Sequence, residues 1–358
     1  MNNDFWQGKK VLITGHTGFK GSWLALWLTI KGAAVTGYSL PPPTKPSFFE
    51  VGGIASGLTS VTGDIRDLNG LNDCVRRSKP EIIIHMAAQS LVRDSYFNPV
   101  DTYSTNVMGT VNILETARNF DFVKVVIIVT SDKCYENREW IWGYRENDPM
   151  GGHDPYSSSK GCAEIVTSAY LRSFFSESAG ANNETMVASV RAGNVIGGGD
   201  WAKDRLVPDI FRAIMDKKEV LIRNPNATRP WQHVLEPLSG YICLAETLWN
   251  KGVEFSGGWN FGPDIKSCRP VAYIIENAKA FWGDKFIYQY GREKNLHEAN
   301  FLWLDCSKAN IQLEWSPRLS LSYSLELTFQ WYQNYIQQKD IRKISEQQIE
   351  LYENLEQQ

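Results

Sequence analysis

Tyr156 and Lys160 are spaced so that their side chains would share one face of a helix. A tyrosine hydroxyl ordinarily ionises at about pH 10, and we expect an ammonium group one helical turn away to favour the phenolate. A phenolate can take the proton from a hydroxyl group while hydride leaves the same carbon atom. The pair therefore indicates base chemistry coupled to an oxidation, and the alternative is an ordinary pair of surface side chains.

A second polar group, Thr130, Ser131, Asp132 and Lys133, stands at the end of the β-branched run 124–130. In an open α/β sheet, ligands bind beyond the carboxyl ends of the strands. If the run is a strand of such a sheet, these side chains lie where a ligand would bind. The alternative for Asp132 and Lys133 is an ion pair at the surface.

Three glycines, Gly15, Gly18 and Gly21, follow the apolar run 9–15 and open the amphipathic stretch 18–31. We predict that the run is a strand and the stretch is a helix. Glycines at such a turn let backbone N–H groups approach a pyrophosphate, and the start of the helix adds a partial positive charge. The context favours a dinucleotide site over a plain glycine turn.

These groups must be positioned by alternating strands and helices. Further strands are predicted at 33–40, 60–65, 81–87 and 124–130, and a further helix at 100–119. Continuous β-branched runs indicate strands that are buried on both faces, so we predict an α/β fold with a Rossmann-like, doubly wound parallel sheet and a smaller, mixed α/β C-terminal lobe.

We expect three regions along the chain. Residues 1–195 would form the dinucleotide-binding domain, and residues 196–340 a lobe that binds mainly substrate and is interleaved with the end of the sheet. Residues 341–358 would be a polar tail, and the chain from Gln337 onward is rich in Gln and Glu, which predicts a frayed helix.

Composition excludes several classes of protein. Hydrophobic residues make up 43% of the 358 residues and charged residues 22%, which is ordinary globular usage and argues against disorder. The net charge of −3 disfavours a nucleic-acid-binding protein, although a local arginine could still hold a small phosphorylated ligand. No apolar run is long enough to cross a bilayer. The six cysteines contain no CxxC pair, so we expect reduced thiols in a cytoplasmic protein.

The motifs together resemble the extended short-chain dehydrogenase/reductase family, in its sugar-nucleotide 4,6-dehydratase branch. The resemblance covers roughly residues 5–335 and is carried by the glycine spacing, by Tyr156 and Lys160, and by the segments 130–146, 191–209, 228–241 and 259–263. Most enzymes of this branch have Asp-Glu after the catalytic hydroxyl residue, whereas this chain has Asp132 and Lys133. In this respect it is similar to the members whose substrate is CDP-glucose.

The resemblance implies a hydro-lyase that converts CDP-D-glucose into CDP-4-dehydro-6-deoxy-D-glucose with NAD as cofactor, for the deoxyhexoses of surface polysaccharide such as O-antigen. Ser131 would orient the substrate and Tyr156, assisted by Lys160, would deprotonate the C4 hydroxyl. Asp132 would protonate the departing C6 hydroxyl. Lys133 would either remove the C5 proton or stabilise the developing enolate as a cation.

The resemblance also assigns binding residues. The expected cofactor contacts are Gly15, Thr17, Gly18, Phe19, Lys20, Gly21, Asp64, Ile65, Ala87, Ala88, Gln89, Asn106, Thr130, Tyr156 and Lys160. The expected substrate contacts are Gln89, Ser131, Asn194, Leu206, Val207 and Arg229. No metal is expected, because His85 has no second ligand at a suitable spacing. A homo-oligomer, dimeric or tetrameric, would form through helices 100–119 and 157–174.

Three alternatives stay open. The chain could be a different sugar-nucleotide 4,6-dehydratase or an epimerase, although an epimerase needs no Asp-plus-base pair. It could also be a non-catalytic NAD(P)-sensing protein, although such proteins often lose the tyrosine or the lysine. The second predicted strand ends in Gly37-Tyr38-Ser39-Leu40, without the acid or arginine that separates NAD from NADP binding, so composition alone leaves that choice open.

Overall fold

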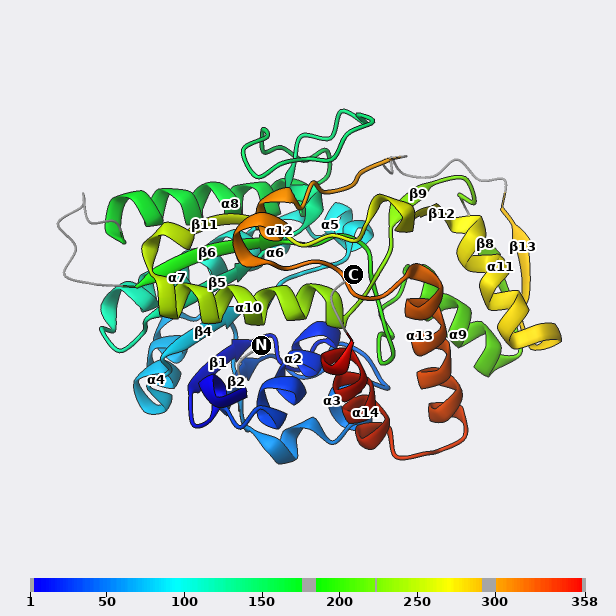
Figure 1. The fold of residues 1–358 in the computed structure, drawn as a ribbon, viewed down its shortest axis with the longest axis horizontal. Coiled ribbons are helices and arrows are strands. Elements are labelled where there is room, and N and C mark those ends of the chain that lie inside the picture. Colours follow the sequence, from blue (N-terminus) through cyan, green and yellow to red (C-terminus); the bar gives the residue numbers. More distant parts are fainter. Residues whose placement is uncertain (1–2, 176–184, 223, 292–300, 356–358) are drawn as a thin grey trace.

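The structure is a computed structural model that describes residues 3–175, 185–222, 224–291 and 301–355. The main strands are β1 Lys10–Thr14, β2 Ala34–Ser39, β3 Thr59–Thr62, β4 Ile82–His85, β5 Val125–Val129, β6 Met186–Arg191 and β11 Gly257–Asn260. Within the described residues they form one parallel sheet of seven strands, in the order β11-β6-β5-β4-β1-β2-β3 (Figure 1). The predicted strands and the doubly wound α/β fold are confirmed.

Fourteen α-helices are present in the described residues: α1 Asn3–Trp6, α2 Phe19–Ile30, α3 Phe48–Val51, α4 Leu68–Ser78, α5 Val92–Phe97, α6 Pro99–Tyr103, α7 Gly109–Asn119, α8 Pro155–Phe174, α9 Leu206–Asp216, α10 Leu235–Lys251, α11 Val271–Trp282, α12 Ser307–Leu313, α13 Leu321–Ile336 and α14 Ile341–Asn354. Short helical turns are η1 Ile54–Gly57, η2 Ser104–Met108, η3 Asp132–Cys134, η5 Val253–Phe255, η6 Ile265–Ser267 and η7 Gly283–Lys285. No helix among these residues is long and apolar enough to cross a membrane.

Alternate residues of each central strand enter opposite cores, as the geometry of a strand requires. Val11 and Ile13 of β1 join a core with α2 and α10, whereas Leu12 between them joins a second core with α4 and α7. Residues of β4 and β5 divide between the two cores in the same way. Burial on both faces is the reason why these strands consist of continuous β-branched runs.

The second lobe is built from short paired strands and the helices that surround them. Its strands are β7 Val195–Ile196, β8 Glu219–Ile222, β9 Thr228–Pro230, β10 Gln232–His233, β12 Cys268–Pro270 and β13 Ile287–Tyr290. They pair as β10-β7, β12-β9 and β13-β8. Beside them, α9 and α11 lie at the right of Figure 1. Strand β11 returns to the edge of the main sheet, where it pairs with β6.

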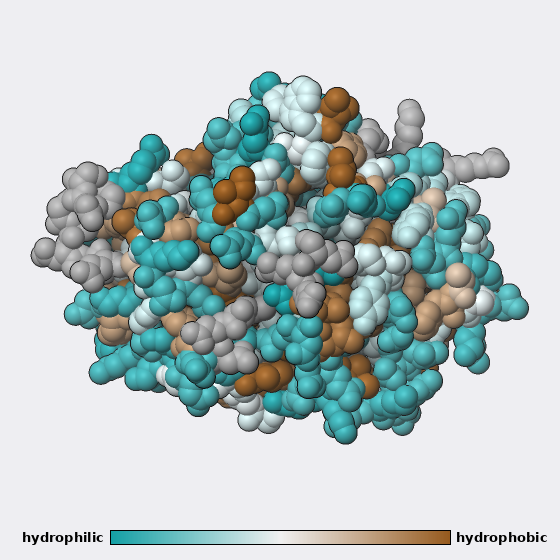
Figure 2. All heavy atoms as spheres, viewed as in Figure 1, coloured by the Kyte–Doolittle hydropathy of each residue, from teal (hydrophilic) through white to brown (hydrophobic). Residues whose placement is uncertain are grey.

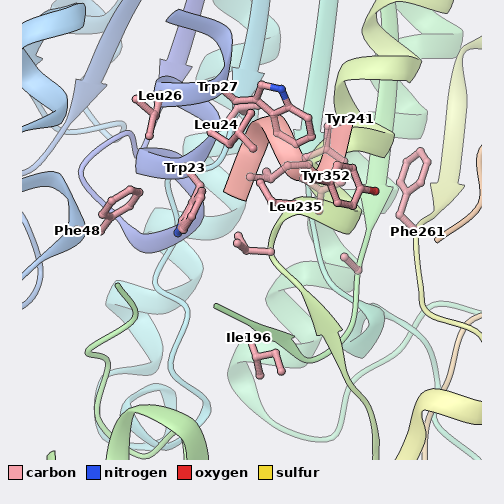
Figure 3. Close-up of a cluster of buried hydrophobic side chains, with 14 of the residues drawn as sticks. Trp23, Leu24, Leu26, Trp27, Phe48, Ile196, Leu235, Tyr241, Phe261 and Tyr352 are labelled. Atoms are coloured by element: carbon pink, nitrogen blue, oxygen red, sulfur yellow. The ribbon is translucent and has the colours of Figure 1, made fainter. Parts of the chain in front are cut away.

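The expectation of a frayed helix from Gln337 onward is wrong. Helix α14 buries one face, which consists of Ile341, Ser345, Gln348, Ile349 and Tyr352. The Tyr352 ring meets the Trp27 ring edge to face at 5.7 Å between centroids, and the two lie side by side in Figure 3. The buried positions recur at helical spacing, but several of them are polar. The segment therefore lacks the apolar stripe by which a packed helix is predicted.

Hydrogen bonds fix α14 to three neighbouring helices. The Tyr352 hydroxyl donates to Glu236 Oε2 of α10 at 2.7 Å, and Trp27 Nε1 of α2 donates to Glu353 Oε1 at 2.7 Å. The Gln348 amide donates to the Leu327 carbonyl of α13 at 2.9 Å. The C-terminal helix therefore completes the core that covers one face of the sheet.

Replacing Tyr352 tests this packing. Tyr352→Ala should lower the free energy of unfolding by about 3–5 kcal/mol, because it leaves a cavity beside Trp27 and removes a donor from the buried Glu236 carboxylate. Urea unfolding measures the change. Glu350→Ala, at an exposed position of the same helix, is the control and should change stability by no more than about 0.5 kcal/mol. Equal effects of the two variants would show that the helix is not packed.

Candidate active site

The glycine turn between β1 and α2 has the shape that a pyrophosphate needs. Gly15 adopts φ +75°, and a Cβ there would lie 2.7 Å from the Ala87 backbone nitrogen. A Cβ at Gly21 would lie 2.1 Å from the Gly15 carbonyl oxygen, so the helix packs directly on the turn. A Cβ at Gly18 would meet only Gly15 O, at 3.3 Å, and would otherwise point into open space.

The first turn of α2 has no side-chain cap, because Gly18 occupies the N-cap position. Its free N–H groups and the helix dipole therefore suit an anion. Phe19 and Lys20 of this turn are partly buried. The Thr17 hydroxyl bonds to Ser39 Oγ at 2.8 Å and to the Leu40 carbonyl at 2.9 Å, which holds the turn against the end of β2. The residues fit a dinucleotide diphosphate.

The predicted catalytic group lies at the carboxyl end of β5. Ser131 Oγ donates to Asp132 Oδ1 at 3.0 Å and accepts from the Lys133 backbone N–H at 3.2 Å, as the cap of turn η3. Ser131 and Asp132 are buried, and Lys133 is partly buried. Only 4% of Asp132 is exposed, which excludes the alternative that it forms an ion pair at the surface.

Helix α8 brings the tyrosine and the lysine to the same place. Asp154 caps its N-terminus by accepting from the Ser157 backbone N–H at 2.9 Å, and Pro155 occupies the first turn. Tyr156 hydrogen bonds to Ser131. Lys160 Nζ donates to the Val129 carbonyl at 3.1 Å, at the end of β5. The two motifs that the sequence separates by some 25 residues therefore form one site.

The surroundings of Tyr156 act on its charge state. Burial raises the pKa of Tyr156 to about 12, and Asp132 acts in the same direction. The hydrogen bond with Ser131 and the charge of Arg205 oppose this rise in pKa.

Asp132 has the character of a proton donor. Burial raises its pKa, while Lys133, Ser131 and Arg229 oppose the rise. Its other carboxylate oxygen, Oδ2, faces Gly193, where a Cβ would lie only 3.0 Å away. A raised carboxyl pKa favours the protonated form, which could donate to a leaving group.

Two lysines of the site, Lys20 and Lys160, carry positive charge that few nearby acidic groups balance. Burial lowers the pKa of Lys20 to about 8, assisted by the charge of Arg205 and opposed by Asp132. Burial and then Lys20 lower the pKa of Lys160 to about 8 as well. Positive charge is therefore concentrated where an anionic ligand would relieve it.

Several further predicted cofactor contacts follow β4 or lie on the turn η2. The Asn106 amide joins Gln89 and α8: its Oδ1 accepts from Gln89 N at 2.9 Å, and its Nδ2 donates to Gln89 O and to Ser159 Oγ. Ala87 and Ala88 lie between β4 and this pair. The Gln89 side chain turns away and bonds to the Leu91 backbone.

Asp64 and Ile65 follow β3, but the Asp64 side chain is engaged in an ion pair with Arg66 at 2.6 Å. Only its backbone is left for an adenine contact. His85 is buried and bonds to Thr14 Oγ1 at 2.7 Å, as expected of an interior histidine. In the described part of the chain, no group of three potential ligands could hold a metal ion.

Several predicted substrate contacts come after β6 or lie on α9 and β9. Asn194 follows β6, and its carbonyl accepts from Gln232 N at 3.0 Å. Leu206 and Val207 start helix α9, and Val207 is buried. Arg229 lies on β9 and faces Asp132 closely enough to affect the carboxyl pKa. A cavity of about 1080 Å³ between η6, α12 and the start of α13 includes none of these residues, so it is separate from the site.

Three polar residues of the site were missed from the sequence. Arg205 precedes Leu206, pairs with Asp200 at 2.9 Å and also reaches Ser90 Oγ. Glu164 and Arg191 form an ion pair at 2.8 Å beneath the catalytic edge, with both side chains 4% exposed. The place of Glu164, one helical turn after Lys160, was the available signal.

Comparison with known proteins agrees with this geometry. The model of the family "GDP-mannose 4,6 dehydratase" matches residues 12–251. The chain belongs to this family, within the extended short-chain dehydrogenases/reductases. It is 54% identical over 352 residues to the CDP-glucose 4,6-dehydratase of Salmonella typhimurium, covering 98% of each chain.

Solved structures show the same fold at lower identity. MoeE5 in complex with UDP-glucose and NAD superposes with a TM-score of 0.77 and 23% identity, over 91% of this chain and 99% of that one. The dTDP-glucose 4,6-dehydratase of Bacillus anthracis in complex with NAD has a TM-score of 0.75 and 21% identity, over 93% and 99% of the two chains.

Proposed function

We propose that this protein is an NAD-dependent CDP-glucose 4,6-dehydratase. The observation that carries the proposal is the group formed by Ser131, Asp132 and Lys133 at the end of β5, in hydrogen-bond contact with Tyr156. An acid and an amine beside the tyrosine supply what an elimination requires and what an epimerase does not need. The 54% identity to a CDP-glucose 4,6-dehydratase supports the substrate, and the NAD bound in complexes of enzymes with the same fold supports the cofactor.

When bound, NAD+ would supply reversible hydride acceptance, from C4 of the sugar and then back to C6. The chain's own residues manage the protons. Ser131 positions the C4 hydroxyl against Tyr156, and the tyrosine takes its proton. A positive nicotinamide ring and Lys160 favour the phenolate that burial opposes, so oxidation is favoured only when the site is filled.

Elimination of the C6 hydroxyl requires an acid and a base on the same sugar. Asp132, whose pKa is raised by burial, donates the proton to the leaving hydroxyl. Lys133 is the next residue along the chain, and we propose two alternative roles for it. As a neutral amine it would remove the C5 proton, and as a cation it would stabilise the enolate. Arg229 and Asn194 are proposed to hold the diphosphate, because a guanidinium and an amide suit phosphate oxygens.

The cellular setting follows from the same chemistry. The product is a 4-keto-6-deoxy nucleotide sugar, a precursor for deoxyhexoses of surface polysaccharide. The six cysteines are all free thiols in the structure, which supports a reducing, cytoplasmic compartment. Differential thiol labelling of protein from intact cells tests this, and oxidised cysteines would contradict it.

We also propose that two copies associate through α6, α7 and α8. Apolar side chains on α5, α6, the turn η2 that leads into α7, and α8 are exposed, namely Phe97, Val100, Tyr103, Met108, Ile165 and Phe174. A patch of this kind on packed helices suits a second copy of the same surface. Sedimentation at micromolar concentration should show at least a dimer. Ile165→Lys should then give a monomer, and a monomeric parent protein would contradict the proposal.

The substrate and the base are tested together. The protein with NAD+ should convert CDP-glucose faster than the UDP, dTDP and GDP analogues, as measured by the base-induced absorbance of the 4-keto product. Tyr156→Phe should reduce turnover at least about a hundredfold with little change in nucleotide-sugar binding. Tyr290→Phe, at an exposed position outside the site, is the control. Turnover of another nucleotide in preference, or normal turnover by Tyr156→Phe, would overturn the assignment.

The division of work between Asp132 and Lys133 is tested by two variants. Asp132→Asn should block loss of the C6 hydroxyl while oxidation at C4 proceeds, so single-turnover mixing should show NADH absorbance that builds and decays slowly. Lys133→Met should suppress exchange of the C5 hydrogen with solvent deuterium. If Lys133→Met exchanges the C5 hydrogen at the normal rate, the lysine is not the base and only its electrostatic role remains. If Asp132→Asn eliminates water normally, Asp132 is not the acid.

A further inference from the structure

Glu164 receives four hydrogen bonds from groups on two strands. Its Oε1 accepts from the Thr130 hydroxyl and from Arg191 Nε at 2.9 Å. Its Oε2 accepts from Ser189 Oγ at 2.6 Å and from Arg191 Nη2 at 2.8 Å. A carboxylate bonded at both oxygens by a guanidinium has a fixed orientation.

The guanidinium extends the contact to a further segment. Arg191 Nη1 donates to the Tyr135 hydroxyl and, at 3.0 Å, to the Glu146 carbonyl. The Tyr135 hydroxyl in turn donates to Asn260 Oδ1 at 2.8 Å, on β11. One buried carboxylate therefore links α8, the ends of β5 and β6, and the segment that follows η3.

The position of Glu164 relative to the catalytic residues is specific. It lies one helical turn after Lys160 and two turns after Tyr156 on α8. Its partner Thr130 immediately precedes Ser131 and Asp132. A change in the Glu164–Thr130 contact would therefore alter the distance between the tyrosine on the helix and the serine and acid on the strand.

We propose that Glu164 is a positioning residue for the dehydratase reaction, which sets helix α8 against the catalytic end of β5 through Thr130 and Arg191 and presents a negative charge to Lys160. This inference rests on the proposed function for its reaction and on the contacts above for its geometry. Glu164 acts through other residues and touches no reacting atom.

The charge has a consequence of its own for Lys160. Burial and then Lys20 lower the pKa of Lys160 to about 8, whereas Glu164 and Cys134 oppose this fall. His85 of β4 also faces the ammonium group, and burial, assisted by Lys160, lowers the His85 pKa, which keeps that histidine neutral. Glu164 itself stays ionised because Arg191 and its hydroxyl partners outweigh its burial and hold its pKa below the usual value. Removing its charge should lower the pKa of Lys160 further.

The experiment compares Glu164→Gln, Thr130→Val and the parent protein at saturating NAD+. Glu164→Gln should reduce kcat at least about tenfold, leave KM for CDP-glucose within about threefold, and move the alkaline limb of the kcat–pH profile down by about one pH unit. Thr130→Val removes the link to β5 but keeps the charge, so it should reduce kcat comparably without moving the limb.

Ser189→Ala is the matched control, because it removes a hydroxyl that donates to the same carboxylate from a residue outside the catalytic end of β5. It should change kcat by less than about twofold. A Thr130→Val variant as active as Ser189→Ala, or an unmoved limb in Glu164→Gln, would overturn the proposal. If Glu164→Gln does not fold because Arg191 is left unpaired, the comparison of Thr130→Val with Ser189→Ala decides.

A readout without turnover separates this inference from the proposed function. The ionisation of Lys160 can be followed by NMR on protein labelled at the lysine ε-carbons, with the resonance assigned through Lys160→Arg. In Glu164→Gln it should titrate at lower pH than in the parent protein. This shift is expected even if CDP-glucose is not the substrate, and an unchanged titration would contradict the role given to the Glu164 charge.

Discussion

The ion pair between Glu164 and Arg191 is the contact on which the catalytic edge depends. Both side chains are buried, and an isolated charge at that depth would cost several kcal/mol. The cost is offset because each group is bonded on several sides: the carboxylate by two hydroxyls and a guanidinium, the guanidinium by a phenol and a carbonyl. These partners come from β5, β6, α8 and the segment after η3. The pair is therefore satisfied only when those elements have their catalytic arrangement.

The charges above this pair fit ligands that carry phosphate. Beyond the effect of burial, the charge of Arg205 lowers the pKa of Lys20, and the charge of Lys20 lowers the pKa of Lys160. Asp132 is the acid beside them, with a pKa that burial raises. Two anionic ligands, a dinucleotide and a nucleotide sugar, would compensate this excess of positive charge. Burial raises the pKa of Tyr156 and so disfavours its phenolate form. The positive charge of a bound nicotinamide ring would favour the phenolate.

Local signals in the sequence predicted most of the frame. The β-branched runs marked β1 to β5, and the glycines, Tyr156 and Ser131 were found because spacing and position report on local structure. Contacts between residues far apart in the sequence were not predicted. Strand β6 carries Ser189 and Arg191, whose polar side chains break an apolar run, and they are tolerable only because Glu164 faces them. The π-helical turn η2, which interrupts the helix expected at 100–119, places Asn106 against Gln89 and Ser159. The buried face of α14 was likewise not predicted, because it contains polar residues whose partners lie far away in the sequence.

The central claim is that the side chains at the end of β5 and on α8 move the protons, while NAD, when bound, would accept hydride from C4 and return it to C6 of the same sugar. Figure 2 shows the side of the molecule seen in Figure 1, where hydrophobic residues are scattered among hydrophilic ones. The most direct test is to supply CDP-glucose with deuterium at C4 and to locate the label in the product by NMR. The account predicts deuterium at C6 of a 4-keto-6-deoxy sugar. Deuterium that returns to C4, or is lost to solvent while no 6-deoxy sugar forms, would contradict it.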